Sequence, residues 1–157
     1  MSCEPIIFQN VSFAYEEASA PLFDDLTAHF SEGWTGIVGA NGTGKTTILK
    51  LAAGELEPQK GHIRSPGRAI YCPQRTERVP PMFPNLIQAI DGDALKIKNL
   101  LDITDDWLQR WDTLSHGERK RAQIGVLLWS RPLALAVDEP TNHLDKEARD
   151  LLAEALR

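Results

Sequence analysis

Hydrophobic and polar positions follow several patterns along the chain, and each pattern predicts a different element. Residues 6–15 are apolar and β-branched and then partly alternating, which predicts a strand. A polar turn separates them from a second, less regular strand over residues 22–30. We expect these strands to form a hairpin-like β layer that leads into a further strand ending at residues 37–38. Residues 48–53 are apolar nearly all round a helical projection, which predicts a buried helix ended by Gly54.

The middle of the chain holds short strands and then a run of prolines. Strands are predicted over residues 62–64 and 69–72, and Pro73 ends the second one. Residues 75–85 are not expected to be regular, because they contain Pro80, Pro81 and Pro84.

Short helices are expected after the proline-rich segment. Their predicted N-caps are Asn85, Asp93 and Thr104. The last helix carries Trp107 and Trp111, which are four residues apart and are expected to share one buried face. We interpret residues 76–114 as a small helical subdomain inserted into an α/β core.

A capping box marks the start of a longer helix. Ser115 is followed three residues later by Glu118, which predicts a helix from this point to about residue 130. Its N-terminal amides and the Ser115 hydroxyl favour an anion, although an isolated box of this kind is by default only a structural cap. The basic residues 119–121 are expected to form a solvated turn. Residues 146–157 have the pattern of an amphipathic helix.

The most specific motif of the chain lies between the strand and the helix expected at residues 37–38 and 48–53. It matches G-x-x-x-x-G-K-[ST] at every fixed position and consists of Gly39, Ala40, Asn41, Gly42, Thr43, Gly44, Lys45, Thr46 and Thr47. In such a loop the backbone N–H groups face phosphate oxygens, the lysine reaches the outer phosphates and the threonine hydroxyl binds Mg²⁺. The alternative is a glycine-rich turn without a ligand. The motif predicts a site for a nucleoside triphosphate.

Two carboxylates, Asp138 and Glu139, follow five apolar residues at 133–137. This pattern predicts a buried parallel strand that delivers both acids to its carboxyl end, where α/β proteins place their chemistry. We expect Asp138 to organise the Mg²⁺ shell and Glu139 to polarise a water in line with the γ-phosphate. The alternative is an acidic strand end without a catalytic role.

Composition limits the class of protein. The 157 residues are 42% hydrophobic and 25% charged, as in ordinary globular domains, and the net charge of −5 argues against nucleic-acid binding through bulk positive charge. Cys3 and Cys72 form no metal-binding spacing, which favours a reducing compartment. No stretch approaches the ~20 apolar residues of a membrane span, so we expect a cytoplasmic protein that does not insert into membranes.

Together these motifs are similar to those of ATP-binding-cassette (ABC) ATPases. The phosphate loop, the signature L-S-H-G-E at residues 114–118 and the acidic pair occur in the order found in that family. The sequence E-P-T-N-H-L-D at residues 139–145 resembles the F subfamily (ABC-F), whose members are soluble, usually carry two cassettes and act on ribosomes. The resemblance implies an α/β fold with a P-loop NTPase core of the ABC type, an N-terminal antiparallel β layer and a small inserted helical subdomain.

The resemblance also implies a division of the chain and a role for individual residues. The β layer would comprise residues 1–33, the core 34–75 and 131–157, and the helical subdomain with the signature helix 76–130. Tyr15 would stack on the adenine of ATP, Gln74 would join the Mg²⁺ shell with Thr46 and Asp138, and Glu139 would be the general base. The residues implied to contact ATP held by a second cassette are Ser115, His116, Gly117 and Glu118, and Asp145 is implied to touch the opposing site.

Two features depart from the family pattern. His116 stands where the signature usually has glycine, so we expect some backbone cost and a bulkier surface there. The chain stops after residue 157, before the strand that carries a phosphate-contacting histidine in the family, and His143 does not occupy that place. We therefore expect an incomplete cassette that is a fragment of a longer two-cassette protein.

These observations leave three hypotheses about function. The first is an ABC-F-type ATPase that closes head to tail on a second cassette, in the same longer chain or in a homodimer, and acts on ribosomes. The second is the ATPase subunit of a transporter whose membrane part is a separate protein. The third is a truncated nucleotide-binding module without efficient hydrolysis.

Overall fold

The computed structural model describes residues 5–65, 67–74 and 76–139. These residues divide into two compact units. The first unit contains the chain up to Tyr71 together with Pro132–Asp138, and the second contains Cys72–Arg131 and Glu139. The last passage from one unit to the other therefore falls between the two neighbouring carboxylates, Asp138 and Glu139.

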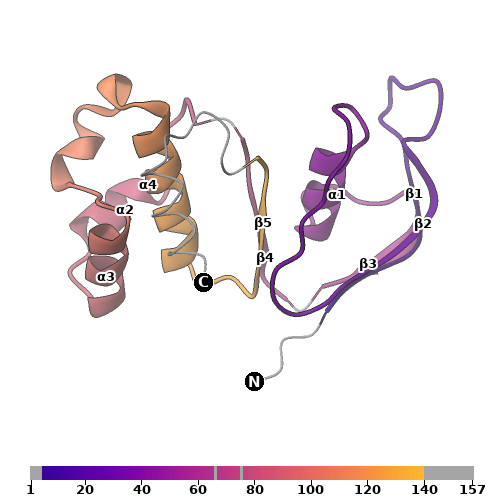
Figure 1. Ribbon diagram of the computed structural model, residues 1–157, viewed down its shortest axis with the longest axis horizontal. Coiled ribbons are helices and arrows are strands. Elements are labelled where there is room, and N and C mark those ends of the chain that lie inside the picture. Colours follow the sequence, from indigo (N-terminus) through magenta and orange to yellow (C-terminus); the bar gives the residue numbers. More distant parts are fainter. Residues whose placement is uncertain (1–4, 66, 75, 140–157) are drawn as a thin grey trace. The chain divides into compact units, whose positions relative to one another are not determined.

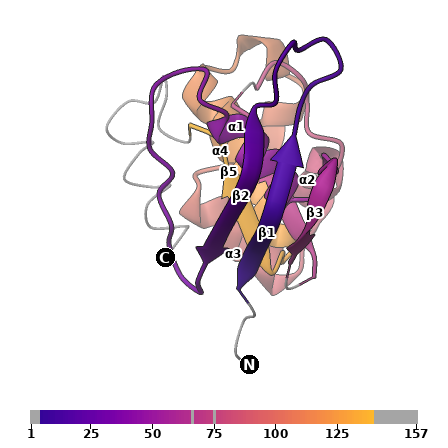
Figure 2. The same cartoon turned by 90° about the vertical axis from the view of Figure 1, so that its right-hand side faces the viewer.

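An antiparallel sheet in the order β2-β1-β3 opens the first unit (Figure 2). The central strand, β1 (Ile6–Phe13), pairs with β2 (Phe23–Phe30) on one side and with β3 (Lys60–Arg64) on the other. Phe8 lies opposite Ala28 in one ladder and Ile63 in the other. The N-terminal antiparallel β layer predicted from the alternating apolar residues is therefore confirmed.

One helix packs against this sheet. Phe8, Val11 and Phe13 of β1 form a buried cluster with Leu51 and Ala52 of α1 (Lys45–Ala52). Burial of each large apolar side chain contributes about 2 kcal/mol, so several of these contacts hold α1 on the sheet. Since α1 is also the helix that follows the phosphate loop, the β layer fixes the position of that loop.

A second, two-stranded sheet completes the first unit. It consists of β4 (Ala69–Cys72) and β5 (Ala134–Val137), which lie side by side in Figure 1. Strands were expected at both places, but β5 is half-buried along its whole length instead of fully buried. Among the described strands β4 is the one that pairs with β5, so β5 lacks the neighbours on both edges that a central strand has.

The strand expected before the phosphate loop is not formed. Residues 34–40 have no regular secondary structure, and Trp34 and Val38 are 72% and 93% exposed. A strand exists only through pairing, and none of the described strands pairs with this segment. The phosphate loop is therefore entered from an irregular, exposed segment.

The second unit is helical (Figure 1). It contains α2 (Phe83–Gln88), α3 (Gly92–Leu100) and α4 (His116–Trp129), and two 3₁₀ turns, η1 (Asp105–Leu108) and η2 (Trp111–Thr113), connect α3 to α4. Its core is made of the buried side chains Phe83, Leu86, Leu101, Trp107, Trp111 and Ile124. This arrangement agrees with a small inserted helical subdomain.

Two predicted helix starts in this unit are wrong. α2 begins at Phe83 instead of after Asn85, because Pro84 lies in the first helical turn, where its missing N–H leaves no bond unmade. α3 is capped by Asp91 instead of Asp93: the Asp91 carboxylate accepts the N–H of Asp93 at 3.1 Å.

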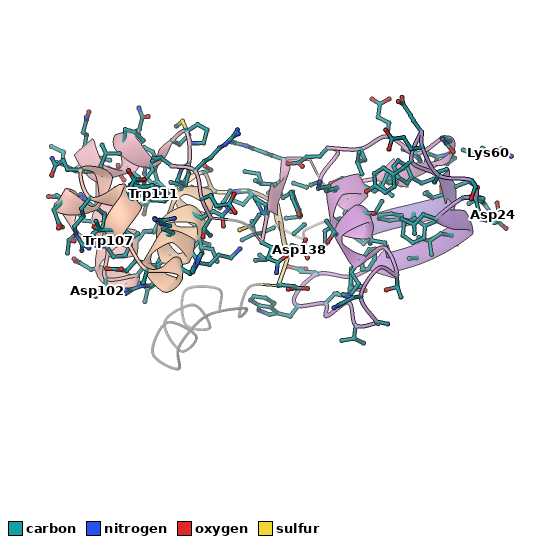
Figure 3. The ribbon with its side chains drawn as sticks, turned by 90° about the horizontal axis from the view of Figure 1, so that it is seen from above. Asp24, Lys60, Asp102, Trp107, Trp111 and Asp138 are labelled. Carbon is teal, nitrogen blue, oxygen red and sulfur yellow. The ribbon has the colours of Figure 1, made fainter. Side chains whose placement is uncertain are left out.

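The two tryptophans are buried, as expected, but they do not share a helix. Trp107 lies in η1 and Trp111 in η2, and Figure 3 shows both within the helical unit. The Trp111 ring packs against Phe83 with centroids 5.5 Å apart, and its indole N–H donates to the Glu77 carbonyl at 3.2 Å. The prediction that both tryptophans are buried is therefore confirmed, and the prediction that they lie on one helix is wrong.

The described helices are short. The longest described helix, α4, has 14 residues, whereas a span needs about 20 apolar ones. Within the described ranges, no helix combines the length and the hydrophobicity that crossing a membrane requires.

Gly61 provides a test of the packing of β3 on β1. A Cβ at this position would lie 2.3 Å from the carbonyl oxygens of Gln9 and Asn10, and its φ is +76°. We predict that Gly61→Ala lowers the free energy of unfolding by about 3 kcal/mol, from backbone strain and overpacking together. Denaturant unfolding measures this loss.

Gly54 is the matched control, because its φ is +75° and nothing lies within 4 Å of a Cβ built there. Gly54→Ala should therefore cost only the conformational strain, about 1 kcal/mol. Equal losses for the two variants would contradict the close approach of β3 to β1.

Candidate functional site

The phosphate loop turns at two glycines with left-handed backbone. Gly42 and Gly44 have φ values of 82° and 93°, where residues with a side chain are strained. Gly44 is also the N-cap of α1, and a Cβ built on it would lie 2.5 Å from the ring of Phe23. Both the backbone conformation and the neighbouring strand therefore require glycine at position 44.

Lys45 folds back over this loop. Its ammonium Nζ donates to the carbonyls of Gly39 at 2.9 Å and Ala40 at 2.8 Å. The Thr43 hydroxyl donates to the same Ala40 carbonyl at 2.9 Å, while residues 41–43 are exposed. The loop is thus held in shape by its own residues, and the positive charge of Lys45 lies against two of its carbonyls.

A hydrogen bond joins the phosphate loop to the end of β5. The Thr46 hydroxyl donates to Asp138 Oδ2 at 2.7 Å, although the two residues are 92 positions apart. The same oxygen accepts the Tyr71 hydroxyl at 3.0 Å, and Asp138 is only 6% exposed. Figure 3 shows Asp138 at the end of the strand pair, on the side of α1. The first of the two predicted acids therefore lies beside the threonine with which it was predicted to act.

Tyr15, the predicted adenine platform, follows the end of β1. Its hydroxyl lies 2.9 Å from Thr47 Oγ1, and its ring packs edge-on against Phe13 at 5.0 Å between centroids. The residue is nevertheless 46% exposed. Tyr15 is thus fixed beside the start of α1 while part of its ring remains accessible.

Glu139, the predicted base, lies in the second unit with Gln74. The Gln74 amide Nε2 donates to Glu139 Oε2 at 2.7 Å. The backbone of Glu139 has a φ of 43°, a left-handed conformation that costs a residue with a side chain about 1 kcal/mol. Such strained residues cluster at functional sites, where surrounding contacts hold them. Two residues singled out separately in the sequence are therefore in direct contact.

The signature segment forms the N-terminus of α4. Ser115 Oγ accepts the Glu118 N–H at 3.2 Å, and the Glu118 carboxylate accepts the Ser115 N–H at 2.7 Å, which confirms the capping box. His116 is the first residue of the helix and is not among the residues with positive φ. The backbone cost expected for histidine at this position is therefore absent, because a first-turn helical residue does not need the freedom of glycine.

Charged neighbours hold the Glu118 carboxylate. The Arg110 guanidinium lies 3.5 Å from Glu118 Oε1 and also pairs with Asp106, which raises the Arg110 pKa. Burial raises the pKa of Glu118, but the backbone and hydroxyl of Ser115 and the charge of Arg110 outweigh it, so that the pKa lies below its usual value of 4.5. Glu118 is therefore a stably ionised cap at neutral pH.

The basic residues 119–121 do not form the solvated turn that was expected. Lys120 is 3% exposed, and its ammonium donates to the Pro73 carbonyl at 2.7 Å. Arg121 lies over the Trp107 ring at 5.2 Å and donates to the Leu101 carbonyl. Long cationic side chains bury their stems and place their charges on carbonyls and rings, which charge patterning along the sequence does not reveal.

Sequence reasoning missed Tyr71 and Lys120. Tyr71 was predicted only as part of a strand. Its position near the end of that strand was the one signal that its hydroxyl could reach the acid at the end of a neighbouring strand, Asp138. The structure gathers Tyr15, the phosphate loop and Asp138 in the first unit, and Gln74, Glu139 and residues 115–118 in the second. Asp145 lies outside the described residues.

Comparison with known proteins shows the family of this chain. The family model described as "ABC transporter" matches residues 23–142, which is most of the chain. The chain belongs to the ABC transporter family. The phosphate loop, Gln74, the signature segment and the acidic pair, with Pro140 and the two residues after it, lie within the matched range.

Relatives of this ABC domain include members of the F subfamily. It is 35% identical to Protein GCN20 of Saccharomyces cerevisiae over 98% of this chain and 22% of that protein. It is 28% identical to ATP-binding cassette sub-family F member 2 of Bos taurus over 96% of this chain and 26% of that protein. The resemblance to ABC-F proteins is confirmed, and the chain spans about a quarter of the length of these relatives.

A solved structure shows that the ABC fold is shared. The dimeric structure of a post-hydrolysis state of the ATP-binding cassette MJ0796, bound to ADP and Pi, matches with a TM-score of 0.76 at 18% identity. The match covers 96% of this chain and 81% of that one. The predicted α/β fold of the ABC type is therefore confirmed.

The ionised cap predicts a pH dependence of stability. Because the folded-state pKa of Glu118 is depressed, its contribution to stability is present above about pH 4.5 and is lost as the pH falls through the folded value. We predict that wild type loses more unfolding free energy than Glu118→Gln between pH 6 and pH 3, by up to about 1 kcal/mol. Parallel losses for the two proteins in denaturant titrations would contradict the capping role of the charge.

Proposed function

We propose that this chain is the nucleotide-binding part of an ABC-F-type ATPase that binds ATP with Mg²⁺ and hydrolyses it. The observation that carries the proposal is the 2.7 Å contact between Thr46 of the phosphate loop and Asp138 at the end of β5. A glycine-rich turn without a ligand has no need of a buried carboxylate next to its threonine. Belonging to the ABC family supports the same function.

The phosphate loop would bind the triphosphate through its backbone and Lys45. Glycine at positions 42 and 44 lets the N–H groups of the loop turn toward one point, and the N-terminus of α1 adds a partial positive charge there. Lys45 would give up its carbonyl partners, Gly39 and Ala40, for the outer phosphates, which form stronger, charge-assisted bonds. Tyr15, which is partly exposed, would stack its ring on the adenine.

The residues around Asp138 fit a magnesium ion. The Thr46 hydroxyl and the buried Asp138 carboxylate supply adjacent oxygens of the kind that Mg²⁺ prefers, and Gln74 is the third residue proposed for its shell. Bound Mg²⁺ neutralises charge on the β- and γ-phosphate oxygens. Tyr71 would fix the Asp138 carboxylate from the other side through its hydroxyl bond.

Glu139 is proposed as the general base. Asp138 already accepts two hydrogen bonds on one oxygen and is buried, so it is poorly suited to take a proton from water. Glu139 is exposed, and the Gln74 amide orients its carboxylate. It would accept a proton from the water whose oxygen attacks the γ-phosphorus, while the bond from that phosphorus to the β,γ-bridging oxygen breaks and ADP leaves.

A second cassette is proposed as the partner of residues 115–118. Ser115 and His116 are exposed at the N-terminus of α4, where the amides and the helix dipole favour an anion. They would contact the γ-phosphate of ATP held by the other cassette, together with Gly117, and Asp145 would touch the opposing site. The dimeric state of the MJ0796 cassette supports this arrangement.

The proposed base is tested by Glu139→Gln in the full-length protein. ATP affinity should stay within about twofold while turnover falls by roughly 100-fold or more, because the amide cannot accept the proton. ATP should stay trapped between the closed cassettes, which co-elution of labelled ATP with the protein in size-exclusion chromatography would detect. Glu55→Gln, at another exposed glutamate, is the control and should behave like wild type.

Lys45→Ala separates binding from chemistry in the same assay. It should weaken ATP binding by about 100-fold, through loss of bonds worth roughly 1.5–3 kcal/mol each. Unchanged turnover in Glu139→Gln would exclude Glu139 as the general base. Unchanged ATP binding in Lys45→Ala would exclude the phosphate loop as the nucleotide-binding site.

The target of the ATP-driven motion is proposed to be the ribosome, because residues 139–145 resemble the F subfamily, whose members act on ribosomes. The second candidate is a transporter subunit, which the family's description favours. We predict that the full-length protein sediments with ribosomes in a sucrose gradient, and that Glu139→Gln increases this fraction in the presence of ATP. Retention with membranes until detergent releases a partner would favour the transporter instead.

A further inference from the structure

Lys120 is an unusual residue for its position in α4. Its side chain is almost fully buried, with 3% of the residue exposed, and its Nζ lies 2.7 Å from the Pro73 carbonyl oxygen. Removing an ammonium group from water costs several kcal/mol unless hydrogen bonds compensate. An apolar side chain would fill the same space without that cost. The hydrogen bond to the Pro73 carbonyl is therefore what lysine provides at position 120 and an apolar residue does not.

The Pro73 carbonyl belongs to the peptide group that leads into Gln74. Since a peptide group is planar, holding its oxygen also fixes the orientation of the nitrogen and Cα of Gln74. The Gln74 amide in turn donates to Glu139 at 2.7 Å. Lys120 itself lies two residues after Glu118, within the first turns of the helix capped by Ser115. A continuous set of contacts thus runs from the signature helix to the proposed base, all within the second unit.

We propose that Lys120 is a positioning residue: it anchors the Pro73–Gln74 segment on α4 and so keeps the Gln74 amide against the Glu139 carboxylate. Its catalytic consequence rests on the proposed ATPase function, whereas the anchoring itself does not. Lys120 touches neither phosphate nor water in this role, and it acts through Gln74.

Lys98 offers a matched control within the same unit. It is also buried, at 9% exposure, and its ammonium donates to the Ile87 carbonyl at 3.0 Å, with Asp105 at 3.4 Å. Both partners are distant from Gln74 and from Glu139 in the sequence. Replacing either lysine by methionine keeps a long, unbranched side chain and removes the charge.

The anchoring is tested without any enzymatic assay by the reactivity of Cys72. This cysteine immediately precedes Pro73 and is 0% exposed. We expect iodoacetamide to alkylate Cys72 several-fold faster in Lys120→Met than in wild type, as measured by mass spectrometry of the peptide from the folded full-length protein. Lys98→Met should alkylate at the wild-type rate. Equal rates in all three proteins, or equal increases in both variants, would overturn the anchoring.

The catalytic consequence is tested by steady-state kinetics. Lys120→Met should lower kcat about tenfold with KM for ATP within about twofold, because it misplaces the base and leaves the phosphate loop intact. In a Gln74→Ala background the same substitution should cause no further loss of kcat, because the amide through which Lys120 acts on Glu139 is already absent. A full additional loss in that background, or an equal loss in Lys98→Met, would show a general structural effect and overturn the proposal.

The two experiments separate the failure of this inference from the failure of the proposed function. Absence of ATP turnover in the wild-type protein would reject the function, while Cys72 alkylation would still decide whether Lys120 anchors the segment. Normal turnover in wild type together with unchanged kcat in Lys120→Met would reject the positioning role alone.

Discussion

The hydrogen bond between Thr46 and Asp138 is the contact on which the site depends. It joins the first turn of α1 to the end of β5 across 92 residues of sequence, in a place where Asp138 is almost fully buried. Burying a carboxylate is unfavourable unless donors surround it, and Thr46 and Tyr71 supply them. The packing of α1 on the β layer holds Thr46 in position. The geometry of the candidate magnesium site therefore depends on the core of the first unit.

The two neighbouring acids are held by separate sets of contacts. Asp138 is fixed by Thr46 and Tyr71 in the first unit, and Glu139 is fixed by Gln74 in the second. The strained backbone of Glu139 marks the point where the chain passes between the units. A buried acid that accepts two hydrogen bonds suits a metal, and an exposed acid oriented by an amide suits proton transfer. The environment therefore separates the roles of two adjacent carboxylates.

Much of this architecture was predictable from local patterns, and the failures have physical causes. Alternating apolar residues predicted the β layer, and the capping box predicted the start of α4, because both signals depend on residues close in sequence. The α3 cap was misplaced by two residues, because Asp91 and Asp93 are both aspartates that can cap a helix. The extended backbone at Asp91 makes it the N-cap, and the sequence does not show this backbone conformation. The buried bond of Lys120 to Pro73 spans 47 residues, and no local pattern indicates it.

The most direct test of the central claim is the environment of Mn²⁺ substituted for Mg²⁺ in the presence of ATP. Pulsed electron-nuclear double resonance of the full-length protein should show phosphorus couplings from one tightly bound Mn²⁺ per site. Asp138→Ala or Thr46→Val should abolish that bound signal, because the oxygens next to the phosphate loop are then lost. A Mn²⁺ signal in the wild type that is identical to free Mn–ATP, or one that survives both substitutions, would contradict the account.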